Sequence, residues 1–212
     1  MDKLIKGALQ FMQEGFEGHK NLYESLKEEQ NPHTLFIGCS DSRVIPNLIT
    51  STLPGELFVV RNIANIVPPY RIKDEFLASV AAIEYAINYL EVENIIICGH
   101  SNCGGCKDIS AEKAKTLPTV KKWVSQLNDI KQQVDFQLEL SHLEGQYALR
   151  AWMIEKANVL NSYKNLLEYP GVAEKLEAKK LTIKAWYFII EAGEIFEYSP
   201  EDGHFIPIKE IN

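Results

Sequence analysis

Three residues at two separated places could hold a metal ion. Cys39 begins the segment CSDSR (residues 39–43), and His100 and Cys103 lie in the segment HSNCGG (residues 100–105); each segment follows an apolar, β-branched run. Two thiolates and an imidazole are a known ligand set for catalytic zinc, which keeps a fourth position for water, whereas structural zinc normally has four protein ligands. The pattern therefore indicates a catalytic centre with one Zn²⁺ per chain.

The remaining thiols and imidazoles fit this site less well. Cys98 lies inside a β-branched run and is expected to pack as a small apolar residue. Cys106 forms a Cys-x-x-Cys spacing with Cys103, which elsewhere signals disulfide exchange or a fourth zinc ligand. The other histidines stand singly in polar stretches and are expected at the surface: His19, His33, His142 and His204.

Asp41 and Arg43 follow the first ligand by two and four residues. A carboxylate beside a metal-bound water can accept its hydrogen bond, and a guanidinium can fix that carboxylate through two parallel bonds. The alternative is a solvated turn with an ion pair of little energetic value. Asp41 could also bind the metal itself and close the fourth position. The role of Arg43 would then be to hold Asp41 away from the metal and keep that position open.

The charge of the ligands bears on the pH at which such a site works. Two thiolates formally neutralise Zn²⁺, so a bound water should be acidified less than at an all-imidazole site, where its pKa falls to about 7. We therefore expect activity that rises through mildly alkaline pH.

Apolar strands with helical segments between them predict an α/β fold with a central, mostly parallel sheet flanked by helices. Strands are expected at residues 34–39, 57–61, 94–99 and 181–190, with an antiparallel edge strand at 193–198 and a turn at 201–203; helices are expected at 76–90 and over much of 120–167. Cys39 and His100 then lie just beyond the carboxyl ends of two strands, where ligands bind in open α/β sheets. Gly104 and Gly105 allow a close approach of the backbone.

The first thirty residues have helical periodicity with a break near Gly15 and Gly18, which predicts two amphipathic helices. They precede the first strand, so a partner subunit could supply the surface for their apolar faces. We expect one domain over residues 1–212, with a helical arm (1–30) and an α/β zinc-binding core (31–212).

Composition excludes several classes of partner. The 212 residues suffice for one well-buried domain, and a net charge of −7 gives no footprint for nucleic acid. No apolar run reaches the length of a membrane span, and the first twenty residues, with Asp2, Glu14 and Glu17, do not resemble a secretory leader. Four cysteines are too few and too clustered for a disulfide framework. We expect a cytoplasmic protein.

The two metal-site segments, together with the block from Pro54 to Asn65, match the β-class carbonic anhydrases in order and spacing, and the chain resembles that family over roughly residues 20–200. The resemblance implies zinc on Cys39, His100 and Cys103. It also implies a homodimer, often paired into a dimer of dimers, in which the N-terminal helices wrap the neighbouring subunit.

The resemblance further implies the reaction. Zinc-bound hydroxide attacks CO₂, bicarbonate leaves in exchange for water, and a proton passes to solvent; Asp41 orients the hydroxide and Arg43 positions Asp41. The narrow substrate pocket of the family would be lined by Gln30, Phe58, Ile63, Tyr85 and Gly104, some of them from the partner chain. Gln30 and Tyr85 could equally be an ordinary loop amide and a helix aromatic.

One subgroup of the family has Asp on zinc at rest and a separate inhibitory bicarbonate site made of a Trp, an Arg and a Tyr. Here Arg61 matches, but Phe36 replaces the Trp and Phe196 is expected to replace the Tyr, so bicarbonate should not bind there. Residues 62–65 and 68–70 are closer to the plant-like subgroup, whose resting zinc carries water. Cys106 departs from the family, in which an apolar residue is more usual, and leaves redox sensitivity open.

Three alternatives remain at this point. The fold could hydrolyse another small linear molecule, such as carbon disulfide, if the access channel differs. The chain could be a thiol redox protein that uses Cys103 and Cys106. It could also be a zinc-binding oligomer without turnover, although such a protein has no need of the Asp41–Arg43 pair.

Overall fold

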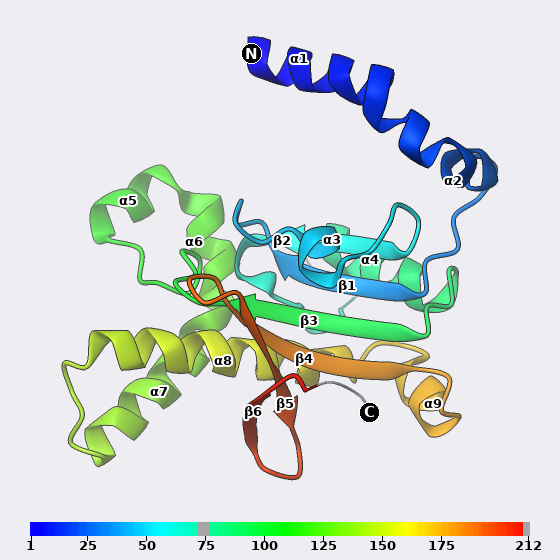
Figure 1. Ribbon diagram of the computed structural model, residues 1–212. Coiled ribbons are helices and arrows are strands. Elements are labelled where there is room, and N and C mark those ends of the chain that lie inside the picture. Colours follow the sequence, from blue (N-terminus) through cyan, green and yellow to red (C-terminus); the bar gives the residue numbers. More distant parts are fainter. Residues whose placement is uncertain (72–76, 210–212) are drawn as a thin grey trace.

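The computed structural model describes residues 1–71 and 77–209. Its centre is a six-stranded sheet with the order β2-β1-β3-β4-β5-β6 (Figure 1). The strands are β1 (Thr34–Cys39), β2 (Leu57–Asn62), β3 (Asn94–His100), β4 (Thr182–Ile189), β5 (Glu194–Ser199) and β6 (His204–Pro207). The first four strands run parallel, and β5 and β6 add an antiparallel edge. The predicted α/β class is confirmed, and β6 is an addition to it.

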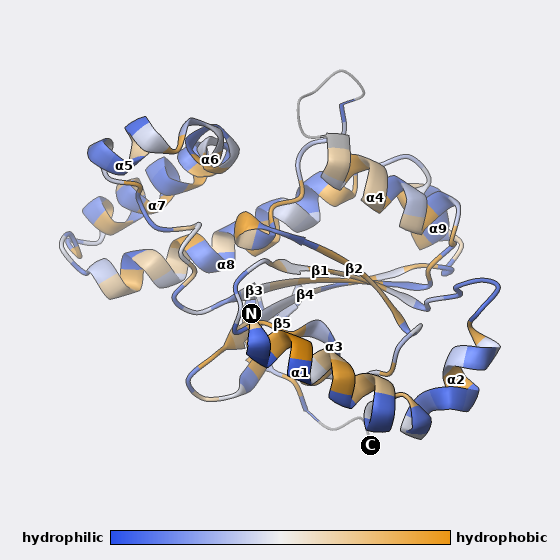
Figure 2. Cartoon of the chain, turned by 90° about the horizontal axis from the view of Figure 1, so that it is seen from above, coloured by the Kyte–Doolittle hydropathy of each residue, from blue (hydrophilic) through white to orange (hydrophobic). Residues whose placement is uncertain are grey.

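Helices lie on both sides of this sheet. They are α1 (Asp2–Gln10), α2 (Lys20–Ser25), α3 (Pro46–Thr50), α4 (Leu77–Asn88), α5 (Ala111–Thr116), α6 (Pro118–Val124), α7 (Asn128–Leu140), α8 (Tyr147–Leu166) and α9 (Val172–Glu177), with 3-10 turns η3 (Ile63–Asn65) and η4 (Ser125–Leu127). Figure 2 shows α4, α8 and α9 on one face and α1 and α3 on the other. No helix in the described ranges is long and apolar enough to cross a bilayer.

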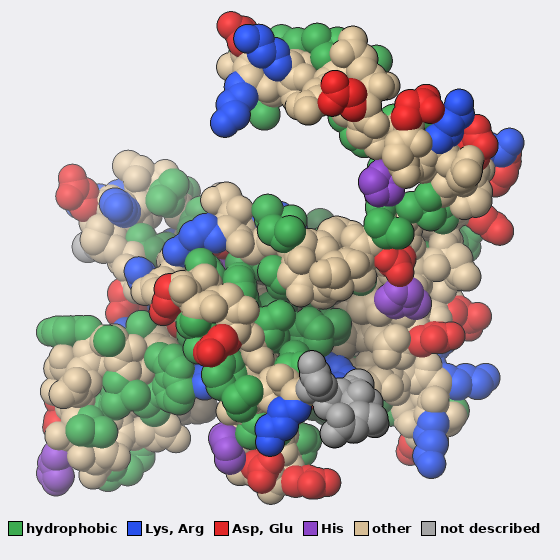
Figure 3. Space-filling model, viewed as in Figure 1, with side chains coloured by type: hydrophobic (Ala, Val, Ile, Leu, Met, Phe, Trp, Pro, Cys, Tyr) green, Lys and Arg blue, Asp and Glu red, His purple; other side chains and the backbone are tan. Residues whose placement is uncertain are grey.

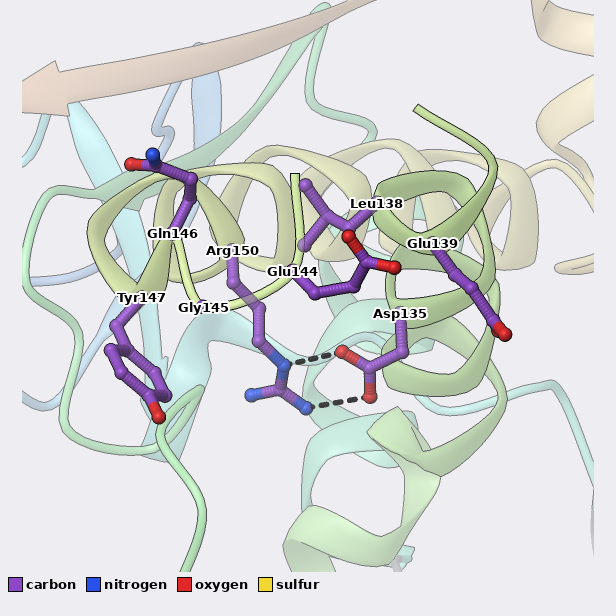
Figure 4. A pocket seen from close by; sticks show the side chains of 8 residues that line it. All are labelled: Asp135, Leu138, Glu139, Glu144, Gly145, Gln146, Tyr147 and Arg150. Atoms are coloured by element: carbon purple, nitrogen blue, oxygen red, sulfur yellow. Dashed lines mark hydrogen bonds and ion pairs between the residues drawn. The ribbon is translucent and has the colours of Figure 1, made fainter. Parts of the chain in front are cut away.

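The helical structure expected over much of residues 120–167 is confirmed, and most of it forms a hairpin of α7 and α8. Residues 141–146 separate α7 from α8, and His142 and Gly145 have positive φ angles of 54° and 82°, which reverse the chain. Near this turn Arg150 of α8 donates two hydrogen bonds to the carboxylate of Asp135 on α7, beside a surface hollow (Figure 4). This turn divides the predicted helical range into two antiparallel helices.

Two apolar layers hold the sheet because side chains alternate along each strand. Leu35 and Ile37 of β1 point to the layer beneath α4 and α8, whereas Phe36 points to the opposite layer with Ile96 and Phe188. All residues of β1 are buried, as expected for a strand covered on both faces.

A third apolar cluster lies between the carboxyl end of the sheet and the α7–α8 hairpin. Cys39, Cys103 and Cys106 are among its members, together with apolar side chains of both helices. The hairpin therefore closes one side of the segment that carries the candidate metal ligands.

Candidate metal centre

The three predicted metal ligands converge at the carboxyl ends of β1 and β3. Because these strands pair in parallel, with Gly38 opposite Cys98, the residues that follow them are neighbours. The ligand atoms of Cys39, His100 and Cys103 all lie within 4.8 Å of one another, and the two sulfur atoms are 3.9 Å apart. All three residues are buried.

The imidazole of His100 is oriented for metal binding. Its Nδ1 lies 2.9 Å from the carbonyl oxygen of Ser101, which can only accept a hydrogen bond, so Nδ1 carries the proton. Nε2 is then left with a lone pair, and it is buried without a hydrogen-bond partner among the described residues. An unpaired buried nitrogen costs stability unless it binds something, and here it faces two thiols. The site therefore fits a metal ion of the kind that two sulfurs and one nitrogen select, zinc above all.

Without metal, the two thiols hold their protons tightly. The hydrogen bond with Cys103, together with burial, raises the pKa of Cys39 to about 12. A hydrogen bond with Cys106 is the main cause that raises the pKa of Cys103 to about 12. A metal ion must displace both protons to bind, since thiolates are the ligands.

Asp41 lies beside this centre, held by Arg43. The Nε and Nη2 atoms of Arg43 donate to the two carboxylate oxygens at 2.9 and 2.8 Å, and its backbone N–H donates at 3.0 Å. These bonds hold the pKa of Asp41 well below its usual range. The carboxylate Oδ2 lies 3.9 Å from Nε2 of His100, so Asp41 is a neighbour of the metal position that is tied to Arg43.

Arg61 supports the same segment from the neighbouring strand. Its guanidinium donates to the carbonyl oxygens of Cys39, at 3.0 Å, and Asp41, at 2.7 Å. Phe196, which we expected at the tyrosine position of a bicarbonate site, packs in the apolar layer beneath α8, and it is Phe188 that packs with Phe36. The placement of Phe196 was therefore wrong, but the residue beside Phe36 is equally apolar.

The segment after Cys103 packs tightly on η3. A Cβ atom added to Gly105 would lie 2.6 Å from Cγ2 of Ile63 and 2.9 Å from Cβ of Ala64, so only glycine fits there. A Cβ at Gly104 would meet no atom within 4 Å. The predicted close approach thus holds for Gly105 and not for Gly104, while Ile63 does lie against the metal-site loop.

The other pocket candidates lie elsewhere in the chain. Gln30 and Tyr85 line one surface hollow of about 800 Å³, and the ring of Phe58 lies 5.9 Å from that of Tyr85. Gln30 precedes β1, so it lies toward the amino ends of the strands, whereas the metal ligands follow the carboxyl ends. One chain therefore does not bring Gln30 to its own metal centre.

A row of buried polar residues on α8 was not predicted from the sequence. Glu155, Asn158 and Ser162 recur at helical spacing on the face that packs inward, and Glu155 contacts the backbone of Cys103. Polar residues at helical spacing within an apolar stripe are a signal that could have found them.

Comparison with known proteins agrees with this geometry. Residues 34–195 match the carbonic anhydrase family. The chain is 44% identical to a carbonic anhydrase of Helicobacter pylori strain J99 over 209 residues, which cover 96% of this chain and 93% of the relative. It is 37% identical to one of Arabidopsis thaliana over 197 residues, which cover 91% and 74%.

Solved structures show the same likeness. The β-carbonic anhydrase CcaA superposes with a TM-score of 0.86 at 37% identity, covering 99% of this chain and 92% of that one. A tetrameric β-carbonic anhydrase of Sordaria macrospora superposes with a TM-score of 0.75 at 30% identity, covering 94% and 98%. By sequence and by fold, the chain belongs to the β-carbonic anhydrase family.

Proposed function

We propose that this chain catalyses the reversible hydration of CO₂ to bicarbonate and a proton, with Zn²⁺ held by Cys39, His100 and Cys103. The observation that carries the proposal is the buried Cys-His-Cys group with its unpaired Nε2, placed beside the Asp41–Arg43 pair. Its relatives bear the name carbonic anhydrase, which supports the same reaction.

When bound, zinc would supply a Lewis acid that lowers the pKa of water and so makes it a better nucleophile. Asp41 is ionised, so it can accept a hydrogen bond from the reacting water and aim its lone pair at CO₂. Arg43 holds Asp41 in that orientation through two side-chain bonds and one backbone bond. Arg61 fixes the backbone on both sides of Ser40 and so sets the distance between Cys39 and Asp41.

The Asp41–Arg43 pair also supports placing this chain in the plant-like subgroup, whose resting zinc carries water. A carboxylate that accepts two hydrogen bonds from one guanidinium must give them up before it can turn toward the metal. We therefore propose that the fourth coordination position stays open to water at neutral pH.

We further propose that two copies of the chain complete the substrate pocket. The arm that carries α1 and α2 stands away from the rest of the chain (Figures 1 and 3). Within this arm, Leu4 of α1 and Met12, which lies between the two helices, are 73% and 68% exposed. Helices that bury none of their own residues need another surface to cover their apolar side. A second copy can supply that surface and bring Gln30 and Tyr85 toward a metal centre, and the tetrameric relative supports this kind of assembly.

The alternative functions find less support. The relatives point to CO₂ rather than to carbon disulfide, and the Asp41–Arg43 pair argues against a site without turnover. Cys103 and Cys106 are both buried, which disfavours thiol exchange with a partner protein. Four unpaired cysteines also suit the cytoplasm, which we propose as the compartment.

The proposal is tested by stripping and restoring the metal. Protein freed of metal with a chelator at neutral pH should show no CO₂ hydration in a stopped-flow indicator assay, and one equivalent of Zn²⁺ per chain should restore it. Cys98→Ser serves as the matched thiol control, because Cys98 is buried in β3 and lies outside the ligand group. Activity that is independent of metal would refute the proposal.

A further inference from the structure

A buried carboxylate on α8 contacts the metal-site loop without taking part in the mechanism above. Glu155 is only 4% exposed. Its Oε1 accepts a hydrogen bond from the backbone N–H of Cys103 at 2.8 Å, and its Oε2 accepts one from the hydroxyl of Tyr187 at 2.6 Å. Both carboxylate oxygens thus have donors, one of them on the backbone of a metal ligand.

Burial of the Glu155 carboxylate lowers the stability of the folded state. A carboxylate removed from water costs several kcal/mol unless hydrogen bonds compensate it. Burial raises the pKa of Glu155 above its usual range, and the bonds from Tyr187 and Cys103 offset only part of that rise. An apolar side chain at this position of α8 would avoid that cost. The free-energy cost of burying this carboxylate therefore suggests that Glu155 has a role besides packing.

The contact fixes the peptide plane that sets the direction of the Cys103 side chain. The N–H of Cys103 is bound by Glu155, and its carbonyl oxygen accepts the N–H of Cys106 at 3.3 Å. With both sides of Cys103 held, its Cα–Cβ bond can point in few directions. Gly105 packs against η3 and anchors the loop at its far end.

The support for Glu155 is itself rigid. Tyr187 is a buried residue of β4, paired in register with Gly99 of β3. A Cβ on Gly99 would lie 2.4 Å from Cγ2 of Val159, so α8 sits on β3 at a distance that only glycine permits. The position of Glu155 relative to Cys103 is thereby set by the packing of α8 on the sheet.

We infer that Glu155 is a positioning residue of the metal centre: its carboxylate holds the Cys103 backbone so that the thiolate points at the metal, and Tyr187 holds the carboxylate. This inference rests on the proposed metal site. It does not depend on which reaction the site catalyses.

The test uses metal binding as its readout. Full-length protein is loaded with Co²⁺, whose thiolate charge-transfer and d–d bands report ligand geometry, and Zn²⁺ release to a chromophoric chelator is timed in parallel. In Glu155→Ala we expect altered Co²⁺ bands and a zinc affinity weaker by about ten- to a hundredfold, the usual effect of losing a group that orients a ligand, which the chelator detects as faster zinc release. Glu155→Gln keeps an acceptor for the Cys103 N–H and should retain wild-type bands.

Ser162→Ala is the matched control. Ser162 is equally buried on the same helix and makes two hydrogen bonds, but to Asn65 and Val67 rather than to the metal-site loop. It should lower stability and leave the Co²⁺ bands and zinc release unchanged. Equal effects of Ser162→Ala and Glu155→Ala would mean that Glu155 only stabilises the fold, and would overturn the inference.

Two further variants keep the test decisive if Glu155→Ala does not fold. Glu155→Asp retains the charge but withdraws it by one methylene, and Tyr187→Phe removes only the hydroxyl that holds the carboxylate. Both should speed zinc release, Tyr187→Phe less than Glu155→Asp. Wild-type bands and release in both variants would overturn the inference, and a chain that binds metal without hydrating CO₂ would overturn only the proposed function.

Discussion

Replacing Gly99 with alanine should weaken the fold and the metal centre together. The new methyl carbon would lie 2.4 Å from Cγ2 of Val159, whereas carbon atoms pack at about 3.5–4.0 Å. Val159 is fully buried on α8, and a β-branched side chain in a helix has essentially one χ1 rotamer, so it cannot swing aside. The helix itself must therefore move away from β3 by about 1 Å.

The expected cost follows from this overlap. Overpacking a core by one methyl group costs about 1–3 kcal/mol, and losing glycine's freedom in the unfolded chain returns about 0.4–1 kcal/mol. The difference spans about 0–2.6 kcal/mol, so the variant should be less stable than wild type by about 1.3 kcal/mol, the middle of that range. Because α8 carries Glu155, the same shift should lengthen its contact with Cys103 and speed zinc release.

A double-mutant cycle measures the clash directly. Val159→Ala alone removes two buried methyl groups and is itself destabilising. In the Gly99→Ala, Val159→Ala protein the two methyl groups that collide are no longer both present, so its loss of stability should be smaller than the sum of the single losses by at least about 1 kcal/mol. Urea unfolding of all four proteins at one protein concentration gives these values. Losses that add to within about 0.5 kcal/mol would refute the packing argument.

Other expectations follow from the charged groups. Arg43→Lys should lower kcat by about ten- to a hundredfold with zinc content unchanged, because lysine cannot donate two parallel bonds to Asp41; an unaltered kcat in stopped-flow assays would contradict this role. Zinc affinity should fall as pH falls, by up to about two decades per pH unit, because Cys39 and Cys103 each release a proton on binding and their metal-free pKa values are raised to about 12; chelator competition between pH 6 and 8 checks this, and a flat affinity would count against thiolate ligation. Hydration should rise through mildly alkaline pH, and a profile flat from pH 6 to 9 would count against the charge argument. Arg150 lowers the pKa of Asp135, so this pair's contribution to stability is present above the unfolded pKa of about 3.9 and is lost as pH falls through the lower folded value. Because Asp135 is half-exposed, Asp135→Asn should lower the free energy of unfolding by less than about 1 kcal/mol in urea at pH 7. A larger loss would contradict the view that this pair is a weak surface ion pair.

The parts of the fold that the sequence predicted are those with local signals. Four parallel strands and the first antiparallel one were expected close to where they lie, because β-branched runs ended by glycine and polar residues mark buried strands. β6 was missed because it is only four residues long and buries little besides Phe205. The turn between α7 and α8 was not located within residues 120–167, because helical periodicity continues on both of its sides.

Some residues of the metal centre could be predicted from the sequence, and others could not. The convergence of Cys39, His100 and Cys103 follows from parallel pairing, since the ends of neighbouring parallel strands meet at one edge. The pocket roles of Gln30 and Tyr85, which rest on the resemblance, stay a prediction, because a single chain does not bring Gln30 to its own metal centre. Glu155 was not found because its contact with Cys103 crosses 52 residues and depends on the packing of α8 on β3.

Stopped-flow CO₂ hydration near pH 8.5 tests the proposed reaction, with zinc-loaded wild type and Asp41→Ala compared at equal zinc content. We expect rapid hydration by the wild type that is largely lost in the variant, since the ionised carboxylate held by Arg43 orients the reacting water. A wild-type protein that holds one zinc per chain and yet does not hydrate CO₂ would contradict the proposed reaction, and full activity in Asp41→Ala would contradict the role given to Asp41.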